Sequence, residues 1–233
     1  MEQLAFELAQ PEPPSFANFA IGRNAEPVDV VVKLAQGARP AAAIVLWGAF
    51  GSGRSHLLHA AVAAASAAGR PALYCAGPSA APAEPPDVGV LVAVDDVGSA
   101  DAAAQGHLFT LYNRLAETGG GLLVAADAPP ARLALRNDLR SRLGAGLVYE
   151  VIPLADGDKP AALVTYARSR GIDLPDDVIA YLLSHGRRDM PSLMATLDAL
   201  DRESLVTKRP ITIPLLRGWM QRALQPPNGP HGP

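Results

Sequence analysis

A glycine-rich loop between two apolar stretches constrains the fold of this chain more than any other feature. Residues 48–55 read Gly-Ala-Phe-Gly-Ser-Gly-Arg-Ser and match the pattern G-x-x-x-x-G-[KR]-[ST]. An apolar run, Ala41 to Trp47, precedes the loop, and a helix-like run, Ser55 to Ala68, follows it. A strand, a glycine turn and a helix in this order are the context in which the pattern binds phosphate. The sequence therefore predicts a phosphate-binding loop, with a bare structural turn as the alternative.

The residue types in the loop suit a nucleotide. The glycines let backbone N–H groups turn inward around phosphate oxygens, and the start of the helix adds its positive dipole. A hydroxyl at Ser55 can ligate Mg²⁺ beside the phosphates. Arg54 stands where Lys is usual, and its planar guanidinium can still pair with phosphate in a forked geometry, although efficient turnover does not follow. The predicted nucleotide-binding residues are Gly48, Gly51, Ser52, Gly53, Arg54, Ser55 and His56.

Buried strands alternate with helices over the first part of the chain. The strand-like runs are residues 41–47, 71–76, 88–94, 122–126 and 147–152, and helix-like runs cover residues 28–36, 55–68 and 100–118. Short, wholly apolar strands that alternate with helices predict a parallel sheet covered on both faces. The expected fold class is therefore α/β, with a five-stranded parallel P-loop sheet and helices on both of its faces.

The pattern changes after Pro153. Helix-like segments then cover residues 158–170, 175–185, 190–205 and 215–224, with residues 211–213 extended before the last one. We therefore expect a small all-helical lid domain after the sheet. The predicted organisation is a flexible N-terminal arm at 1–14, a nucleotide-binding core at 15–153, the helical lid at 154–225, and a disordered Pro/Gly-rich tail at 226–233.

Three carboxylates follow buried strands at the edge of the sheet where the phosphate loop is expected. Asp95 and Asp96 close the third strand, and Asp127 closes the fourth. Ligands collect at this edge of open α/β sheets, so Asp95 is expected to hold Mg²⁺ and Asp96 to position an attacking water. Asp127 could sense the γ-phosphate or this water. The alternatives are a solvated helix start for the pair and a turn-capping role for Asp127.

Arg142 lies in a basic stretch just before the last strand. From this place an arginine can project toward the nucleotide of a neighbouring subunit, where it stabilises charge on the transferring phosphoryl group. The alternative is a solvated basic face, which the neighbouring Arg132, Arg136 and Arg140 would share.

The composition limits the partners and the cellular compartment that we expect for the chain. Its net charge of −3 and the lack of a basic run argue against direct recognition of DNA. The single Cys75 excludes an internal disulfide and fits a reducing cytosol, and its strand-like run predicts a buried thiol. No apolar stretch reaches the ~20 residues that span a bilayer, and a secretory signal is missing. We expect a cytoplasmic protein without a membrane partner.

The first residues alternate between polar and apolar side chains. Apolar residues stand at positions 4, 6 and 8 of the run Gln3 to Leu8. This run could form an edge strand of the fold. It could equally be a short linear motif that inserts Leu and Phe into a pocket of a partner.

Several local strings occur together in an order typical of one family. They are Leu46-Trp47-Gly48, Gly53-Arg54-Ser55-His56-Leu57-Leu58-His59-Ala60, Leu111-Tyr112-Asn113-Arg114, Arg140-Ser141-Arg142-Leu143-Gly144 and Thr196-Leu197-Asp198. From Phe16 to about Leu224 the chain resembles the AAA+ core of the bacterial replication initiator DnaA. It is more similar to the short Hda-like regulators of that initiator, which act in the regulatory inactivation of DnaA.

The resemblance implies a function that works on a partner. Hda-like proteins bind ADP (or ATP) with Mg²⁺, attach to the DNA-loaded sliding clamp, and stimulate ATP hydrolysis by DnaA as negative regulators of initiation. By this resemblance Arg142 is an arginine finger offered in trans, and self-association or assembly with the initiator is reasonable. Pro191 departs from the family, which usually has Arg there. The residues similar to the clamp-binding motif are Gln3, Leu4, Phe6 and Leu8.

A second function stays open at this point. The chain could be a self-sufficient P-loop ATPase, or a loader that acts on another replication protein, rather than an activator of a partner's ATPase. Arg54 and Pro191 weigh against this alternative. Steady phosphate release by the purified chain alone would support it.

Overall fold

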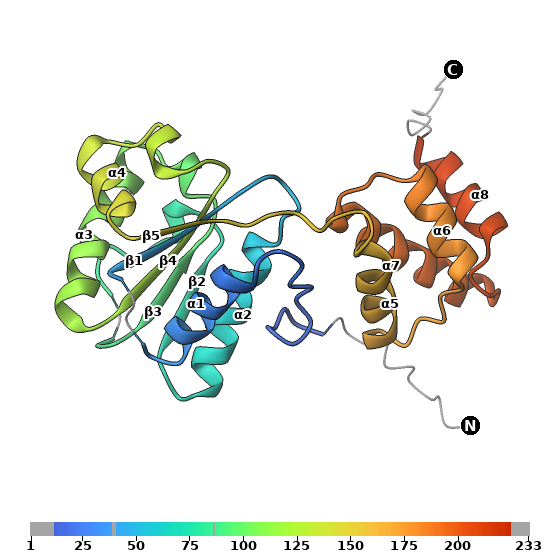
Figure 1. The fold of residues 1–233 in the computed structure, drawn as a ribbon, viewed down its shortest axis with the longest axis horizontal. Coiled ribbons are helices and arrows are strands. Elements are labelled where there is room, and N and C mark those ends of the chain that lie inside the picture. The colour runs from blue at the N-terminus through green and yellow to red at the C-terminus, as the bar shows by residue number, and fades with distance from the viewer. Residues whose placement is uncertain (1–11, 39–40, 86, 225–233) are drawn as a thin grey trace, which may run out of the picture. The chain divides into compact units, whose positions relative to one another are not determined.

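The computed structural model describes residues 12–38, 41–85 and 87–224, which form two compact units (Figure 1). One unit runs from Pro13 to Leu154, and the other contains the chain from Ala155 onward.

The first unit is a parallel sheet with the strand order β2-β3-β4-β1-β5. Figure 1 shows its helices on both faces of this sheet. The elements in chain order are α1 (Ala25–Ala35), β1 (Ala43–Trp47), α2 (Arg54–Ala67), β2 (Ala72–Cys75), β3 (Leu91–Val94), α3 (Ala102–Thr118), β4 (Gly121–Ala126), α4 (Asn137–Gly144) and β5 (Leu147–Glu150). Three short 3₁₀ turns are η1 (Pro78–Ala80), η2 (Val97–Ser99) and η3 (Pro130–Arg132). The predicted fold class is confirmed.

Each face of the sheet has its own apolar core, because successive side chains of a strand point to opposite sides. Val45, Val92 and Val124 pack with residues of α3 and α4 in one core. Ile44 and Leu123 pack with residues of α1 and α2 in the other. The three central strands β1, β3 and β4 are apolar along their length since both faces are covered. Cys75 is buried, as expected, and burial raises the pKa of its thiol.

The helices differ most from the prediction in three places. The first helix begins at Ala25, three residues before the predicted Val28, and the buried Asn24 exchanges two hydrogen bonds with the backbone of Ile152 just before it. Residues 137–144 form α4, which the sequence indicated only as a polar stretch. Ile213, predicted as extended, is the first residue of the last helix.

Within its described residues, the second unit consists of four helices. They are α5 (Lys159–Ser169), α6 (Asp176–His185), α7 (Met190–Thr207) and α8 (Ile213–Leu224). Leu163, Leu193, Leu197 and Leu216 are buried among them. Asp189 caps α7, because its carboxylate accepts a hydrogen bond from the Ser192 N–H at 2.9 Å.

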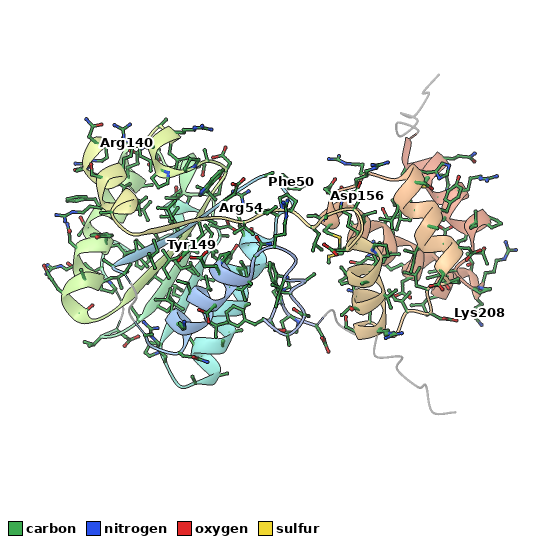
Figure 2. All side chains as sticks on the ribbon, viewed as in Figure 1. Phe50, Arg54, Arg140, Tyr149, Asp156 and Lys208 are labelled. Carbon is green, nitrogen blue, oxygen red and sulfur yellow. The ribbon has the colours of Figure 1, made fainter. Side chains whose placement is uncertain are left out.

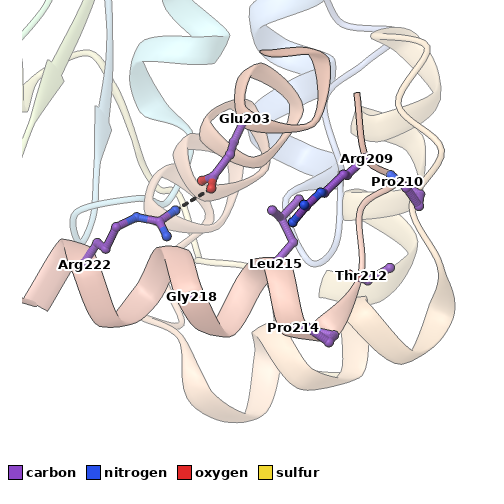
Figure 3. Close-up of a pocket in the computed structure, with 8 residues that line it drawn as sticks. All are labelled: Glu203, Arg209, Pro210, Thr212, Pro214, Leu215, Gly218 and Arg222. Atoms are coloured by element: carbon purple, nitrogen blue, oxygen red, sulfur yellow. Dashed lines mark hydrogen bonds and ion pairs between the residues drawn. The ribbon is translucent and has the colours of Figure 1, made fainter. Parts of the chain in front are cut away.

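Polar contacts also tie the lid helices together. Asp198 of α7 accepts a 2.8 Å hydrogen bond from the Tyr166 hydroxyl and lies 3.4 Å from the Arg170 guanidinium. Burial and this hydrogen bond raise the pKa of Tyr166 to about 12. A surface pocket of about 280 Å³ lies at the end of α7 and along α8, where Glu203 and Arg222 form an ion pair (Figure 3). No described helix is long and apolar enough to cross a membrane.

Candidate nucleotide-binding site

The predicted phosphate loop lies between β1 and α2, in the expected strand–turn–helix context. Two glycines are required by close packing. A Cβ on Gly48 would stand 2.4 Å from the Val151 carbonyl oxygen, and one on Gly53 would stand 2.6 Å from Cε2 of Phe19. Gly53 also has a φ of +100°, which L side chains rarely adopt. Phe19 was not predicted as part of the site.

Ser52 supplies a direct sign that the loop can take a ligand. The residue is only 6% exposed. Its Oγ has no hydrogen-bond partner within the described parts of the chain. A buried hydroxyl without a partner is unfavourable, and an acceptor such as a phosphate oxygen would satisfy it. The loop therefore fits the phosphate group that its sequence predicts.

Arg54 is the first residue of α2 and points across the end of the sheet. Its guanidinium donates a hydrogen bond to the carbonyl of Ala126, the last residue of β4. Figure 2 shows Arg54 together with Phe50, whose ring is 71% exposed at the outside of the loop. In this arrangement the arginine braces β4 instead of filling the loop.

The two residues after Arg54 lie in different surroundings. Ser55 is exposed at the start of α2, where its hydroxyl is accessible. The ring of His56 is half-buried, with Nε2 2.9 Å from the Ser15 carbonyl and its centroid 5.3 Å from that of Phe19. Burial lowers the pKa of His56, so the neutral ring is favoured near pH 7.

The carboxylates Asp95 and Asp96 follow β3 at the carboxyl end of the sheet. The Tyr74 hydroxyl donates to Oδ2 of Asp95 at 3.1 Å, and the Asp96 N–H donates to Oδ1 of Asp95 at 2.9 Å. Burial and Asp95 raise the pKa of Tyr74 to about 12. Asp96 is exposed, and its φ of 48° is uncommon for a non-glycine residue. Sequence reasoning missed Tyr74, because no local pattern shows that β2 pairs with β3.

Asp127 lies close to the turn that begins at Asp96. Its Oδ1 is 3.2 Å from the place where a Cβ on Gly98 would stand, in η2. The structure thus brings Asp127 and the turn after β3 together. Asp127 is exposed and its carboxylate is accessible from this edge of the sheet.

Magnesium at this site would need ligands beyond the protein. Within the described residues, no group of three or more His, Cys, Asp or Glu side chains could hold a metal ion. Mg²⁺ is usually bound by one or two protein ligands together with substrate phosphates and waters. Ser55 and Asp95 are chemically suited to that arrangement, in which a bound nucleotide completes the metal's shell.

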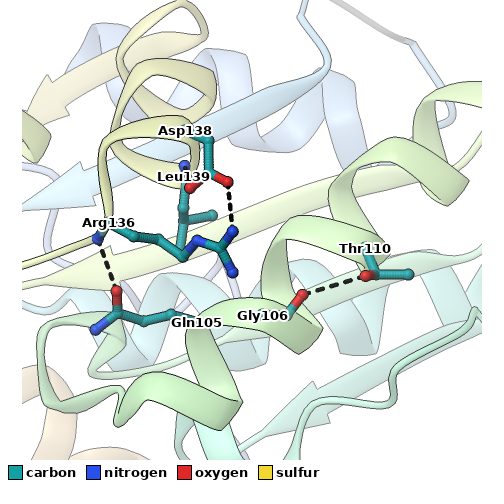
Figure 4. Close-up of polar contacts among 6 residues, drawn as sticks. All are labelled: Gln105, Gly106, Thr110, Arg136, Asp138 and Leu139. Carbon is teal, nitrogen blue, oxygen red and sulfur yellow. Dashed lines mark hydrogen bonds and ion pairs between the residues drawn. The ribbon is translucent and has the colours of Figure 1, made fainter.

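Arg142 lies in the last turn of α4 and is exposed. Its guanidinium is 5.8 Å from the ring centroid of Tyr112 on α3. The described residues give Arg142 no salt bridge, whereas the neighbouring Arg136 is engaged twice (Figure 4). Arg136 donates to Asp138 at 2.7 Å from its side chain and to Oε1 of Gln105 from its backbone. Arg142 is therefore free to meet an anion outside this chain.

The residues Gln3, Leu4, Phe6 and Leu8 lie outside the described part of the chain, so their prediction as a clamp-binding motif stays a prediction.

Comparison with known proteins finds similarity to two kinds of replication protein. Residues 156–220 match the family model of the Hda lid domain. Domain III of the replication initiation protein DnaA from Thermotoga maritima superposes with a TM-score of 0.81 at 17% identity, over 93% of this chain and 100% of that chain. The chain thus combines a lid similar to that of Hda with a fold similar to that of DnaA domain III.

Two further structures share the fold. AMPPCP-bound DnaA from Aquifex aeolicus has a TM-score of 0.68 at 20% identity, over 84% of this chain and 66% of that chain. The RuvB Holliday junction branch migration motor of Thermotoga maritima has a TM-score of 0.67 at 16% identity, over 90% of this chain and 72% of that chain. At these identities the likeness concerns the fold, whereas the similarity to Hda is specific to the lid at residues 156–220.

Proposed function

We propose that this chain is an Hda-like negative regulator of replication initiation, which binds ADP and stimulates ATP hydrolysis by DnaA in trans. The observation that carries the proposal is the match of residues 156–220 to the Hda lid. The fold shared with DnaA domain III supports an interaction with that initiator, because related AAA+ domains can pair head to tail.

The loop chemistry supports the nucleotide. Gly53 admits the close packing of the loop, and the partnerless Ser52 hydroxyl suits a phosphate oxygen. AMPPCP, an adenine nucleotide analogue, is bound in the Aquifex aeolicus DnaA structure with the same fold. When bound, Mg²⁺ would neutralise phosphate charge, with Ser55 and Asp95 as the protein groups on its side. Arg54 occupies the place of the usual lysine, so we expect retention of ADP more than rapid turnover.

Arg142 supports action on a partner. An exposed guanidinium that no carboxylate of the described chain neutralises can approach the triphosphate of a neighbouring subunit. Arginine fingers of this kind contribute about 10³–10⁵ in rate. Residues 3–8 would supply attachment to the sliding clamp, where Leu and Phe fill an apolar pocket.

The decisive experiment measures ATP hydrolysis by ATP-loaded DnaA in the presence of this protein, the sliding clamp and primed DNA. Wild-type protein should accelerate hydrolysis, and Arg142→Ala should reduce it to the unstimulated rate. Arg140→Ala is the matched control, because Arg140 lies two residues earlier on the same helix and pairs with Asn137 at 2.5 Å. Normal stimulation by Arg142→Ala would exclude the finger.

Binding to the clamp and the alternative ATPase function are tested by two separate experiments. Deletion of residues 1–8 should abolish binding to the clamp while ADP binding persists, and intact clamp binding would contradict that part of the proposal. Phosphate release by the purified chain alone, lost in Asp95→Ala, would instead identify a self-sufficient ATPase.

A further inference from the structure

Tyr74 fixes the side chain of Asp95 from the neighbouring strand. It pairs in register with Ala93, two residues before Asp95. The Tyr74 hydroxyl donates to Oδ2 of Asp95 at 3.1 Å, and the Asp95 N–H donates to the Cys75 carbonyl at 2.9 Å. The end of β2 therefore holds both the backbone and the carboxylate of Asp95.

The ring of Tyr74 is itself held by the helix that starts at the phosphate loop. His59 of α2 stacks on Tyr74 with ring centroids 3.8 Å apart and an interplanar angle of 29°. Tyr74 is half-buried, so this contact limits the orientations of its ring. His59, Tyr74 and Asp95 thus form a continuous line of contacts from α2 to the strand edge.

Both oxygens of Asp95 are oriented but not saturated. Oδ2 has the Tyr74 hydroxyl as a donor, and Oδ1 has the Asp96 N–H at 2.9 Å. A carboxylate oxygen has two lone pairs, so each can accept a further hydrogen bond from a metal-bound water or bind the metal directly. Partners that orient a ligating carboxylate typically change metal affinity by about 10–100-fold.

We propose that Tyr74 is a positioning residue, which holds Asp95 for the Mg²⁺ that accompanies the bound nucleotide. This inference rests on the proposed nucleotide site. Tyr74 does not touch the nucleotide in this role, so its effect depends on the metal.

Calorimetric titration of the full chain with ADP, in Mg²⁺ and in EDTA, tests this role. Tyr74→Phe keeps the ring and its stack on His59 but removes the hydroxyl. We expect its ADP affinity to fall about 10-fold in Mg²⁺ and to stay at the wild-type value in EDTA. Asp95→Asn should show the same Mg²⁺-specific loss, and adding Tyr74→Phe to it should cause no further loss. His59→Ala should give a smaller loss of the same kind.

Tyr149→Phe is the control, because Tyr149 is a partly buried tyrosine of β5 in the same sheet (Figure 2). It should leave both affinities unchanged. The positioning role would be overturned if Tyr74→Phe bound ADP in Mg²⁺ as tightly as the wild type does. It would also be overturned if the variant lost the same ADP affinity in Mg²⁺ and in EDTA. In both cases the nucleotide site itself would stand. Failure of the wild-type protein to bind ADP at all would overturn the site itself and this inference with it.

Discussion

The ring of Phe19 closes over Gly53, with its Cε2 only 2.6 Å from the place where a Cβ on that glycine would stand. Phe19 also meets the ring of His56, at 5.3 Å between centroids. The segment before α1 therefore packs directly on the last glycine of the phosphate loop. Any side chain at position 53 must displace this aromatic ring and also adopt a φ of +100°.

Gly53→Ala should weaken nucleotide binding by distorting the loop. A left-handed backbone costs an alanine about 1–2 kcal/mol, before the clash with Phe19 is added. We expect the dissociation constant for ADP to rise about 10-fold or more, since about 1.4 kcal/mol corresponds to tenfold. Titration calorimetry measures it. Gly69→Ala is the control, because Gly69 has a φ of +77° but no atom within 4 Å of its Cβ position; it should lose stability and keep ADP affinity.

Ser52→Ala should weaken ADP binding without lowering the stability of the free protein. The Ser52 hydroxyl is buried and without a partner in the described chain, so its removal should leave the melting temperature of the free protein unchanged or slightly higher. Its loss should nevertheless reduce ADP affinity by about 5-fold, corresponding to one hydrogen bond of about 1 kcal/mol. Ser204→Ala, whose hydroxyl donates to the Arg209 carbonyl at 2.5 Å, should leave ADP affinity unchanged. A large drop in melting temperature for Ser52→Ala would contradict the prediction.

Tyr112 should support Arg142 through its ring rather than its hydroxyl. The guanidinium lies 5.8 Å from the ring centroid, a distance at which an exposed cation–π contact contributes about 0.5–1 kcal/mol. Tyr112→Leu should therefore reduce stimulation of DnaA ATPase about 2- to 5-fold, whereas Tyr112→Phe should retain it. Both variants should bind ADP like the wild-type chain, and a loss of ADP binding would indicate general misfolding instead.

Two ion pairs of the lid should differ in how much they contribute to its stability. The Arg170 side chain is 11% exposed beside Asp198, whereas Arg222 is 60% exposed beside Glu203. Asp198→Ala leaves the Tyr166 hydroxyl without its acceptor and the Arg170 charge without its partner, so we expect a loss of about 2–3 kcal/mol in unfolding free energy. Arg222→Ala should change it by less than about 1 kcal/mol. Equal effects in denaturant titrations would contradict this ordering.

The cap of α7 should make lid stability depend on pH in the acid range. The hydrogen bond from Ser192 holds the pKa of Asp189 below its usual value of 3.8, despite an opposing effect of burial. A carboxylate with a lowered folded pKa stabilises the fold above pH 3.8 and loses this contribution as the pH falls through its folded pKa. Asp189→Ala should cost about 1 kcal/mol at pH 7, with a smaller difference from wild type below pH 3.8. A difference that does not change with pH would exclude the charged cap.

The sequence predicts the sheet well because each strand of this core is a short apolar run bounded by turns. Leu91 to Val94 and Leu122 to Ala126 are found as strands near their predicted positions. The helix α4 was missed because only Leu139 and Leu143 are buried on it, a single repeat among charged residues. One repeat does not distinguish a short helix from a polar loop.

Site residues were predictable where they belong to a sequence motif, and not where only tertiary contacts bring them to the site. The glycine loop, Asp95 and Asp127 follow from strand ends, which parallel topology brings to one edge. Phe19 and Tyr74 were missed because their roles depend on which residue they face. Phe19 meets Gly53 from 34 positions away, and Tyr74 reaches Asp95 across a strand pair that no local pattern specifies.

The hydrogen bond from Arg54 to the carbonyl of Ala126 has a consequence for how tightly phosphate can be held. Because a guanidinium has five N–H donors, Arg54 could hold an incoming anion while one of them stays on the Ala126 carbonyl. A phosphate in the loop and the end of β4, next to Asp127, would thereby be linked through one side chain. A lysine, with its single compact ammonium, would contact the phosphate and the Ala126 carbonyl in a different geometry.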